Sequence, residues 1–171
     1  LSLSSSDYEG MLEKIKADEE AMLRLDRRTV DAITPGEQQP EADHKVSSEN
    51  SMTGYQDNDA YRTVRQGGSF SYDLYTEGRT DLTLCLGFWG NESQAGPAGM
   101  NVSRSLQVLF DGEVIVNETE FPSTGESAVV RKEYSVPQEA IEGKDKVRVT
   151  FRAGESGFAA RIFDVRFLKE E

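Results

Sequence analysis

From residue 69 onward, hydrophobic and polar residues alternate along the chain with a period of two. The alternation recurs in short segments between turn residues, at 69–75, 82–89, 106–110, 114–116, 130–136, 147–151 and 158–168. This pattern is typical of β-strands that bury one face. Asp111-Gly112 separates two of these segments and predicts a two-residue hairpin turn, since both turn positions need a positive φ. We therefore expect seven or eight antiparallel strands.

These strands predict the fold class. Each strand has one apolar face, so two antiparallel sheets packed face to face bury the most hydrophobic surface. We therefore predict a mainly β protein: an antiparallel two-sheet β-sandwich of the jelly-roll or galactose-binding-like type, with an N-terminal α-helix. The glycine-rich stretch 90–104 is expected to be an exposed loop between two strands.

Residues 7–28 show the only convincing helical pattern. Ser6 and Glu9 have the spacing of a capping box at its start. Hydrophobic residues recur at helical spacing and form a stripe: Tyr8, Met11, Leu12, Ile15, Met22 and Leu23. We expect the helix to lie on the following domain. The alternative is a helix that binds a partner or links to a larger neighbour.

Residues 34–68 are poor in hydrophobic side chains and rich in turn formers and acids. We expect a long ordered loop or extended arm there, with a short strand near residues 44–48. The chain is accordingly divided into an N-terminal helix and tail (1–28), an arm that packs on the sandwich (29–68) and the sandwich itself (69–171). Together these parts are expected to form one globular domain.

Composition and charge exclude several classes of function. The chain has 31 acids and 19 bases, a net charge of −12, which argues against binding to a nucleic-acid backbone. No apolar run approaches the roughly 20 residues of a membrane span. One cysteine and one histidine exclude an internal disulfide and a multi-histidine metal site. Cys85 lies in an apolar strand and His44 in a polar segment, so we expect structural roles for both.

Aromatic and polar side chains suggest a sugar-binding surface. Sugars stack on flat aromatic faces flanked by hydrogen-bonding groups. Trp89 ends a predicted strand beside Asn91, while Tyr55, Tyr61 and Arg62 lie in the predicted arm. These five residues are the candidate ligand-binding set. The alternative is structural: Trp89 closes the core and the two tyrosines hold the arm in place.

No residue set points to catalysis or to a bound cofactor. Paired carboxylates hydrolyse glycosides when they are held about 5–10 Å apart, but the acid-rich runs lie in predicted loops. We therefore expect no catalytic residues and no cofactor. Asp57-Asn58-Asp59 offers oxygen ligands for calcium but lacks the glycine and distal glutamate of an EF-hand.

A series of segments in this order resembles one known family. They are 28–31, 35–41, 43–44, 49–51, 53–54, Arg62, 67–74, 89–90, 111–112 and 160–166. This series is similar to the C-terminal β-sandwich accessory domain of β-L-arabinofuranosidase-type glycoside hydrolases, over about residues 26–168. No part of this chain resembles the catalytic barrel of those enzymes, so their catalytic residues cannot be assigned here.

The resemblance implies a function, a partner and a location. It implies a non-catalytic accessory module of a polysaccharide-binding or polysaccharide-degrading system, with a carbohydrate or a carbohydrate-active protein as its partner. A periplasmic or cell-surface location follows by analogy. Two alternatives remain: a protein-docking module without sugar affinity, and a small glycoside hydrolase.

Overall fold

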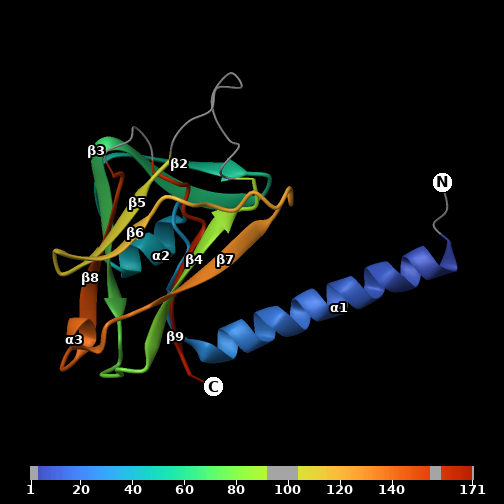
Figure 1. The fold of residues 1–171 in the computed structure, drawn as a ribbon, viewed down its shortest axis with the longest axis horizontal. Helices are drawn as coiled ribbons and strands as arrows, with labels where there is room; N and C mark the ends of the chain where they lie inside the picture. The colour runs from blue at the N-terminus through green and yellow to red at the C-terminus, as the bar shows by residue number, and fades with distance from the viewer. Residues whose placement is uncertain (1–3, 92–103, 155–158, 171) are drawn as a thin grey trace.

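Two antiparallel sheets packed face to face form the body of the protein, as predicted (Figure 1). The computed structural model describes residues 4–91, 104–154 and 159–170. The four-stranded sheet has the order β1 (Thr29–Ile33), β9 (Asp164–Lys169), β4 (Leu82–Trp89) and β7 (Val129–Ser135). The five-stranded sheet has the order β2 (Ser47–Gln56), β3 (Asp59–Tyr75), β8 (Lys146–Arg152), β5 (Leu106–Phe110) and β6 (Glu113–Glu118). The helices are α1 (Ser5–Arg28), α2 (Gln38–Asp43) and α3 (Gln138–Ile141).

The core lies between the sheets and consists of the inward members of the alternating pattern. Phe70, Tyr72, Leu74, Val147, Val149, Phe151, Leu84, Leu86, Val165 and Phe167 are all fully buried. The rings of Phe110 and Phe167 meet edge to face across the two sheets, 5.7 Å apart. Removal of these side chains from water is the main stabilising contribution to a sandwich of this kind.

The β5–β6 hairpin confirms the turn predicted from Asp111-Gly112. Both residues have a positive φ, 48° at Asp111 and 88° at Gly112. Phe110 pairs with Glu113 across the turn. The primed turn twists in the same sense as its strands, which is why this dipeptide is so strongly associated with hairpins. The predicted loop 90–104 lies outside the described residues, apart from its ends at 90, 91 and 104.

The long loop expected over residues 34–68 is wrong, because this segment contains α2, β2 and the first part of β3; the short strand expected near residues 44–48 corresponds to the start of β2 at Ser47. β2 is an edge strand, and most of its side chains face solvent. An edge strand of this kind can be polar throughout, so hydrophobic alternation does not reveal it. β3 bends where Gly67 has a φ of +81° and where a Cβ on Gly68 would lie 2.8 Å from two carbonyl oxygens of β2.

The long N-terminal helix forms where expected but does not lie on the domain. α1 has no buried residue, and Figure 1 shows it projecting from the sandwich. Five of the six residues of the predicted stripe are about half exposed, from 48% at Leu12 and Ile15 to 58% at Leu23, and Met22 is less exposed. Among the described residues, the polar contacts between the helix and the sheets lie in its last turn: Asp26 with Arg166, and Arg28 with Glu133 and the Lys169 carbonyl oxygen.

The helix cap differs from the prediction by two residues. α1 begins at Ser5, and its N-cap is Ser4 rather than Ser6. The Ser4 hydroxyl accepts from the Asp7 backbone N–H at 3.2 Å and donates to the Asp7 carboxylate at 2.7 Å. Asp7 takes the position expected of Glu9, but its carboxylate accepts from the Ser4 hydroxyl rather than from the backbone N–H of the N-cap residue. Within the described residues, no helix is long and apolar enough to cross a membrane.

His44 has the structural role predicted for it and joins α2 to β1 of the four-stranded sheet. Its Nδ1 lies 2.7 Å from the Pro40 carbonyl oxygen, and its Nε2 lies 2.8 Å from the Asp31 carboxylate. Both partners are acceptors, so the arrangement favours the doubly protonated ring. The hydrogen bond to Asp31 outweighs partial burial and raises the pKa of His44 above its ordinary value.

This arrangement predicts a pH dependence of stability. Because the pKa of His44 is raised in the folded protein, its contact with Asp31 stabilises the fold fully below the unfolded-state pKa of about 6.5. This stabilisation is lost as the pH rises through the folded-state pKa of His44. Urea unfolding from pH 6 to 9 is expected to show a falling free energy of unfolding. A His44→Asn variant should lose about 1.5–3 kcal/mol at pH 6 and show a flatter profile. If the free energy of unfolding fell equally with pH in the wild-type protein and in His44→Asn, His44 would not be the cause of the pH dependence.

Cys85 is buried in β4, as its apolar neighbours predicted. Burial raises the pKa of its thiol to about 11, with the nearby Asp164 carboxylate adding to the shift. The thiolate is the reactive form of cysteine. Cys85 is therefore a structural residue rather than a nucleophile.

Candidate functional site

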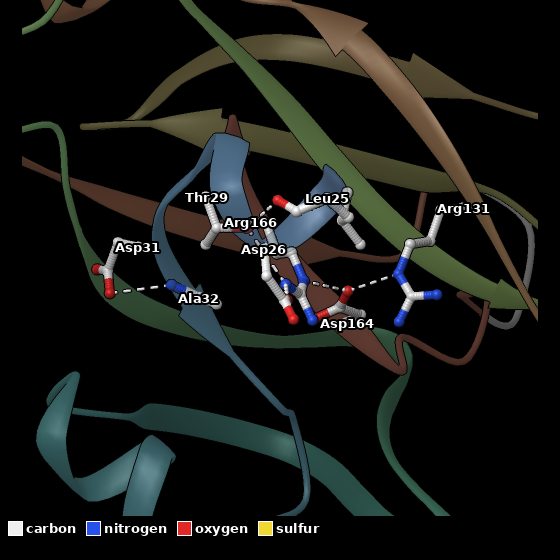
Figure 2. Close-up of polar contacts among 8 residues, drawn as sticks. All are labelled: Leu25, Asp26, Thr29, Asp31, Ala32, Arg131, Asp164 and Arg166. Atoms are coloured by element: carbon white, nitrogen blue, oxygen red, sulfur yellow. Dashed lines mark hydrogen bonds and ion pairs between the residues drawn. The ribbon is translucent and has the colours of Figure 1, made fainter. Parts of the chain in front are cut away.

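The outer face of the four-stranded sheet contains a buried carboxylate held by two arginines. Asp164 begins β9 and is only 4% exposed. Its Oδ2 accepts from the Nε of Arg131 at 2.8 Å and from the Nε of Arg166 at 2.7 Å. Figure 2 shows the carboxylate between the two guanidinium groups. Two charge-assisted hydrogen bonds fix all three side chains in place.

Gly87 explains how Asp164 and the two arginines fit on the sheet. Gly87 lies in β4 and pairs with Asp164 on one side and Arg131 on the other. A Cβ at Gly87 would lie 2.9 Å from the Asp164 Cβ and 2.9 Å from a methyl group of Val129. The glycine therefore leaves the space that lets Asp164 and Arg131 meet above the middle of the sheet.

The two arginines differ in what their remaining nitrogens contact. Arg166 also donates from Nη1 to Asp26 at 2.8 Å and to Thr29 at 3.2 Å, which connects it to the end of α1. The Nη groups of Arg131 have no hydrogen-bond partner among the described residues, and in Figure 2 only the Nε of Arg131 is joined to Asp164 by a dashed line. Arg131 is thus a positioned donor with two unused groups.

Arg131 and Asp164 help to line a pocket of about 220 Å³, which we call the outer-face pocket. Four segments far apart in the sequence contribute to it: the β1–α2 connection, the β2–β3 turn, β7 and the start of β9. Its lining residues are Thr34, Glu37, Asn58, Asp59, Ala60, Val129, Arg131, Phe163, Asp164 and Arg166.

Unused polar groups lie together in this pocket. The side chains of Glu37, Asn58 and Asp59 are exposed and make no hydrogen bond or ion pair with another described residue. They supply acceptors and an amide, while Arg131 supplies donors. Phe163 borders the pocket but is only 3% exposed, so it offers a ligand little apolar surface.

An aromatic cluster supports this part of the pocket. The Phe163 ring lies 5.5 Å from Trp89 and 5.3 Å from Tyr61 between ring centroids. The Arg161 guanidinium lies over Tyr61 and Phe163, at 5.4 and 5.6 Å from their centroids, and donates to Gln56. Trp89 is only 5% exposed, so it contacts Phe163 and leaves little surface for a ligand.

The five predicted ligand-binding residues do not form one platform. Trp89 and Tyr61 meet through Phe163, whereas Tyr55 is 69% exposed. Tyr55 pairs with Ala60, next to Tyr61, so alternation places the two tyrosines on opposite faces of the hairpin. Asn91 follows β4, and its Oδ1 is buried without a hydrogen-bond partner in the described residues.

Arg62 is a structural residue in a buried polar network. It donates to both carboxylate oxygens of Glu41, at 2.7 and 2.8 Å, and to the Ser51 hydroxyl. Tyr72 also donates to Glu41. Burial alone would raise the pKa of Glu41, but the Arg62 and Tyr72 hydrogen bonds outweigh it and the pKa is lowered. Burial, together with the Glu41 contact, raises the pKa of Tyr72 well above its ordinary value.

The arrangement of Asp57, Asn58 and Asp59 does not support the calcium site considered from the sequence. Asp57 and Asn58 form the β2–β3 turn, and Asp57 has a φ of 56°. Across the described parts of the chain, no group of three or more His, Cys, Asp or Glu side chains is placed to hold a metal ion.

Sequence reasoning missed most of the pocket. Asp164 and Arg166 carried one usable signal, since charged residues that alternate within an otherwise apolar strand indicate an outer face with a polar function. Phe163 is two residues from Val165 in the alternating segment 158–168, but it precedes β9 and joins the aromatic cluster rather than the core between the sheets. Glu37 and Asp59 gave no signal, because they lie in polar segments.

Solved structures share this fold at low sequence identity. A family 6 carbohydrate-binding module from Cellvibrio mixtus lichenase 5A, solved with cellotriose, matches 84% of this chain and 99% of its own, with 12% identity and a TM-score of 0.51. An exo-β-1,3-galactanase from Phanerochaete chrysosporium, solved with β-1,3-galactotriose, matches 72% of this chain, with 16% identity and a TM-score of 0.54. The match covers only 27% of the galactanase.

A third similar structure is a family GH115 4-O-methyl-α-glucuronidase with specificity for decorated arabinogalactans. It matches 84% of this chain and 18% of its own, with 13% identity and a TM-score of 0.52. The fold therefore resembles carbohydrate-binding modules and parts of larger glycoside hydrolases. No curated protein matches the chain. Over residues 24–168 the chain matches a family of unknown function, and it belongs to that family, DUF6805.

Proposed function

We propose that this chain is a non-catalytic, carbohydrate-associated accessory module that binds a glycan in the outer-face pocket. The observation that carries the proposal is the grouping within that pocket of hydrogen-bonding groups that no other described residue uses. Arg131 supplies the donors, and Glu37 and Asp59 supply the acceptors. Sugar hydroxyls both donate and accept hydrogen bonds, so they can use both kinds of group.

Two further observations support the proposal. The fold resembles a carbohydrate-binding module over nearly that module's whole length. The order of sequence segments resembles the accessory domain of β-L-arabinofuranosidase-type hydrolases. A place in a polysaccharide-binding or polysaccharide-degrading system, at the cell surface or in the periplasm, is part of the proposal.

A ligand binds in the pocket without rearrangement of the hydrogen-bonded group formed by Asp164, Arg131 and Arg166. The Asp164 carboxylate fixes the Nε of Arg131, so the guanidinium plane is set before a ligand arrives. Its Nη groups then donate to sugar hydroxyl oxygens, while Glu37 and Asp59 accept from sugar hydroxyl hydrogens. Preorganised groups bind more tightly because less side-chain entropy is lost on association.

Arg131→Met is the direct test of this site. Affinity electrophoresis through gels containing arabinogalactan, arabinan, β-glucan or polygalacturonic acid is expected to show retardation by at least one polysaccharide. The variant should bind that polysaccharide about tenfold more weakly, because it lacks two donors. Arg152→Met is the matched control, since Arg152 lies exposed on β8 in the other sheet.

Two outcomes would contradict the proposal. Retardation by none of the polysaccharides would favour the protein-docking alternative. Hydrolysis of reporter glycosides by the purified chain, lost in Glu37→Gln or Asp59→Asn, would favour the glycosidase alternative, since both carboxylates line the same pocket. We expect no turnover.

A further inference from the structure

We infer that the outer-face pocket holds a single neutral sugar residue at the end of a glycan chain. This inference rests on the proposed function and specifies its ligand. Three properties of the pocket support it: its size, the kinds of hydrogen-bonding group that line it, and its charge.

The size of the pocket fits one ring. Its volume of about 220 Å³ lies below the roughly 300–1,000 Å³ of pockets for drug-sized ligands. The β1–α2 connection contributes Thr34 and Glu37, the β2–β3 turn contributes Asn58, and the start of β3 contributes Asp59 and Ala60. These segments border the space above the sheet, so a long chain would meet them rather than lie flat across β9 and β7.

The lining groups suit hydroxyls rather than a single charged group. A hydroxyl both donates and accepts, so it can use the Arg131 donors and the Glu37 or Asp59 acceptors at once. An isolated anionic ligand would use only Arg131, and a cationic one only the carboxylates. The Asn58 amide offers both kinds of contact within the same turn.

The charge disfavours acidic sugars. The pocket contains two arginines and three carboxylates, Glu37, Asp59 and Asp164. One carboxylate is already held by both arginines, so the two that remain unpaired, Glu37 and Asp59, lie where a uronic acid would enter. The whole chain carries a net charge of −12, which adds long-range repulsion of anionic polysaccharides.

Counting chain ends tests the inference. The polysaccharide that the protein retains most strongly is compared, at equal mass, before and after partial acid hydrolysis, which multiplies its ends. As a competitor in affinity electrophoresis, the hydrolysed sample is expected to release the protein at a several-fold lower concentration. Methyl glycosides of galactose, glucose and arabinose should compete, and galacturonic acid should compete at least tenfold less well.

A double variant tests whether the carboxylates disfavour acidic sugars. Combining Glu37→Gln with Asp59→Asn is expected to weaken binding of the neutral sugar about tenfold and to raise the relative affinity for galacturonic acid. The matched control for this change in charge is Glu139→Gln with Glu142→Gln, which removes two exposed carboxylates at α3, outside the pocket.

The outcomes separate this inference from the proposed function. Retention that does not depend on the number of ends, or a preference for galacturonic acid in the unmodified protein, overturns the inference while carbohydrate binding stands. Failure of every polysaccharide and sugar to bind overturns both. End-dependent binding that Arg131→Met leaves unchanged places the sugar at another site and also overturns the inference.

Discussion

Replacing Arg62 by alanine is expected to lower the free energy of unfolding by about 3–5 kcal/mol, because it leaves the buried Glu41 carboxylate without its cation. Glu41 is 5% exposed and receives two of its hydrogen bonds from Arg62. A domain of ordinary stability, about 5–15 kcal/mol, would lose a large part of its stability. Urea unfolding followed by circular dichroism measures the change.

Two further variants show whether the charge itself is responsible. Arg79→Ala removes an arginine that pairs with Asp81 in a more exposed setting and should change stability little. The double variant Glu41→Gln, Arg62→Ala should lose less than the sum of the Glu41→Gln and Arg62→Ala effects, because neither charge is then left unpaired. Strict additivity, or an Arg62→Ala effect as small as that of Arg79→Ala, would show that the network is not a coupled unit.

Trp89→Ala is the second substitution expected to have a large effect, a loss of about 3–5 kcal/mol. The side chain is 5% exposed and packs against Phe163, so its removal leaves a cavity beside that ring. Tyr55→Ala is the control, since Tyr55 is 69% exposed and its loss should hardly move the melting temperature.

This pair of variants also distinguishes the two interpretations of Trp89 set out from the sequence. A lower melting temperature assigns Trp89 to packing. Lost glycan retention with an unchanged melting temperature would instead make the indole a direct sugar contact, which its burial argues against. Trp89→Phe keeps part of the packing and should lie between the wild-type protein and Trp89→Ala in stability.

Local pattern predicted the central strands and the β5–β6 hairpin. β8 and the second half of β3 bury alternate residues between the two sheets, so the period of two in their sequence predicts them. The same criterion missed β2 and the first part of β3, because an exposed edge strand buries few side chains and shows no such period. The helix α1 was predicted within two residues at its start, but its contact with the domain was wrong.

The sequence by itself therefore determined the fold class, the sheet core and the structural roles of Cys85 and His44, because each follows from the character of immediate neighbours. Only the tertiary structure decided where α1 points, why Arg62 is buried with Glu41, and how the outer-face pocket forms. The reason is physical. The pocket joins Glu37, Asp59, Arg131 and Asp164 through strand register, and Gly87 provides the space between them. Register is a long-range property that no single stretch of sequence carries.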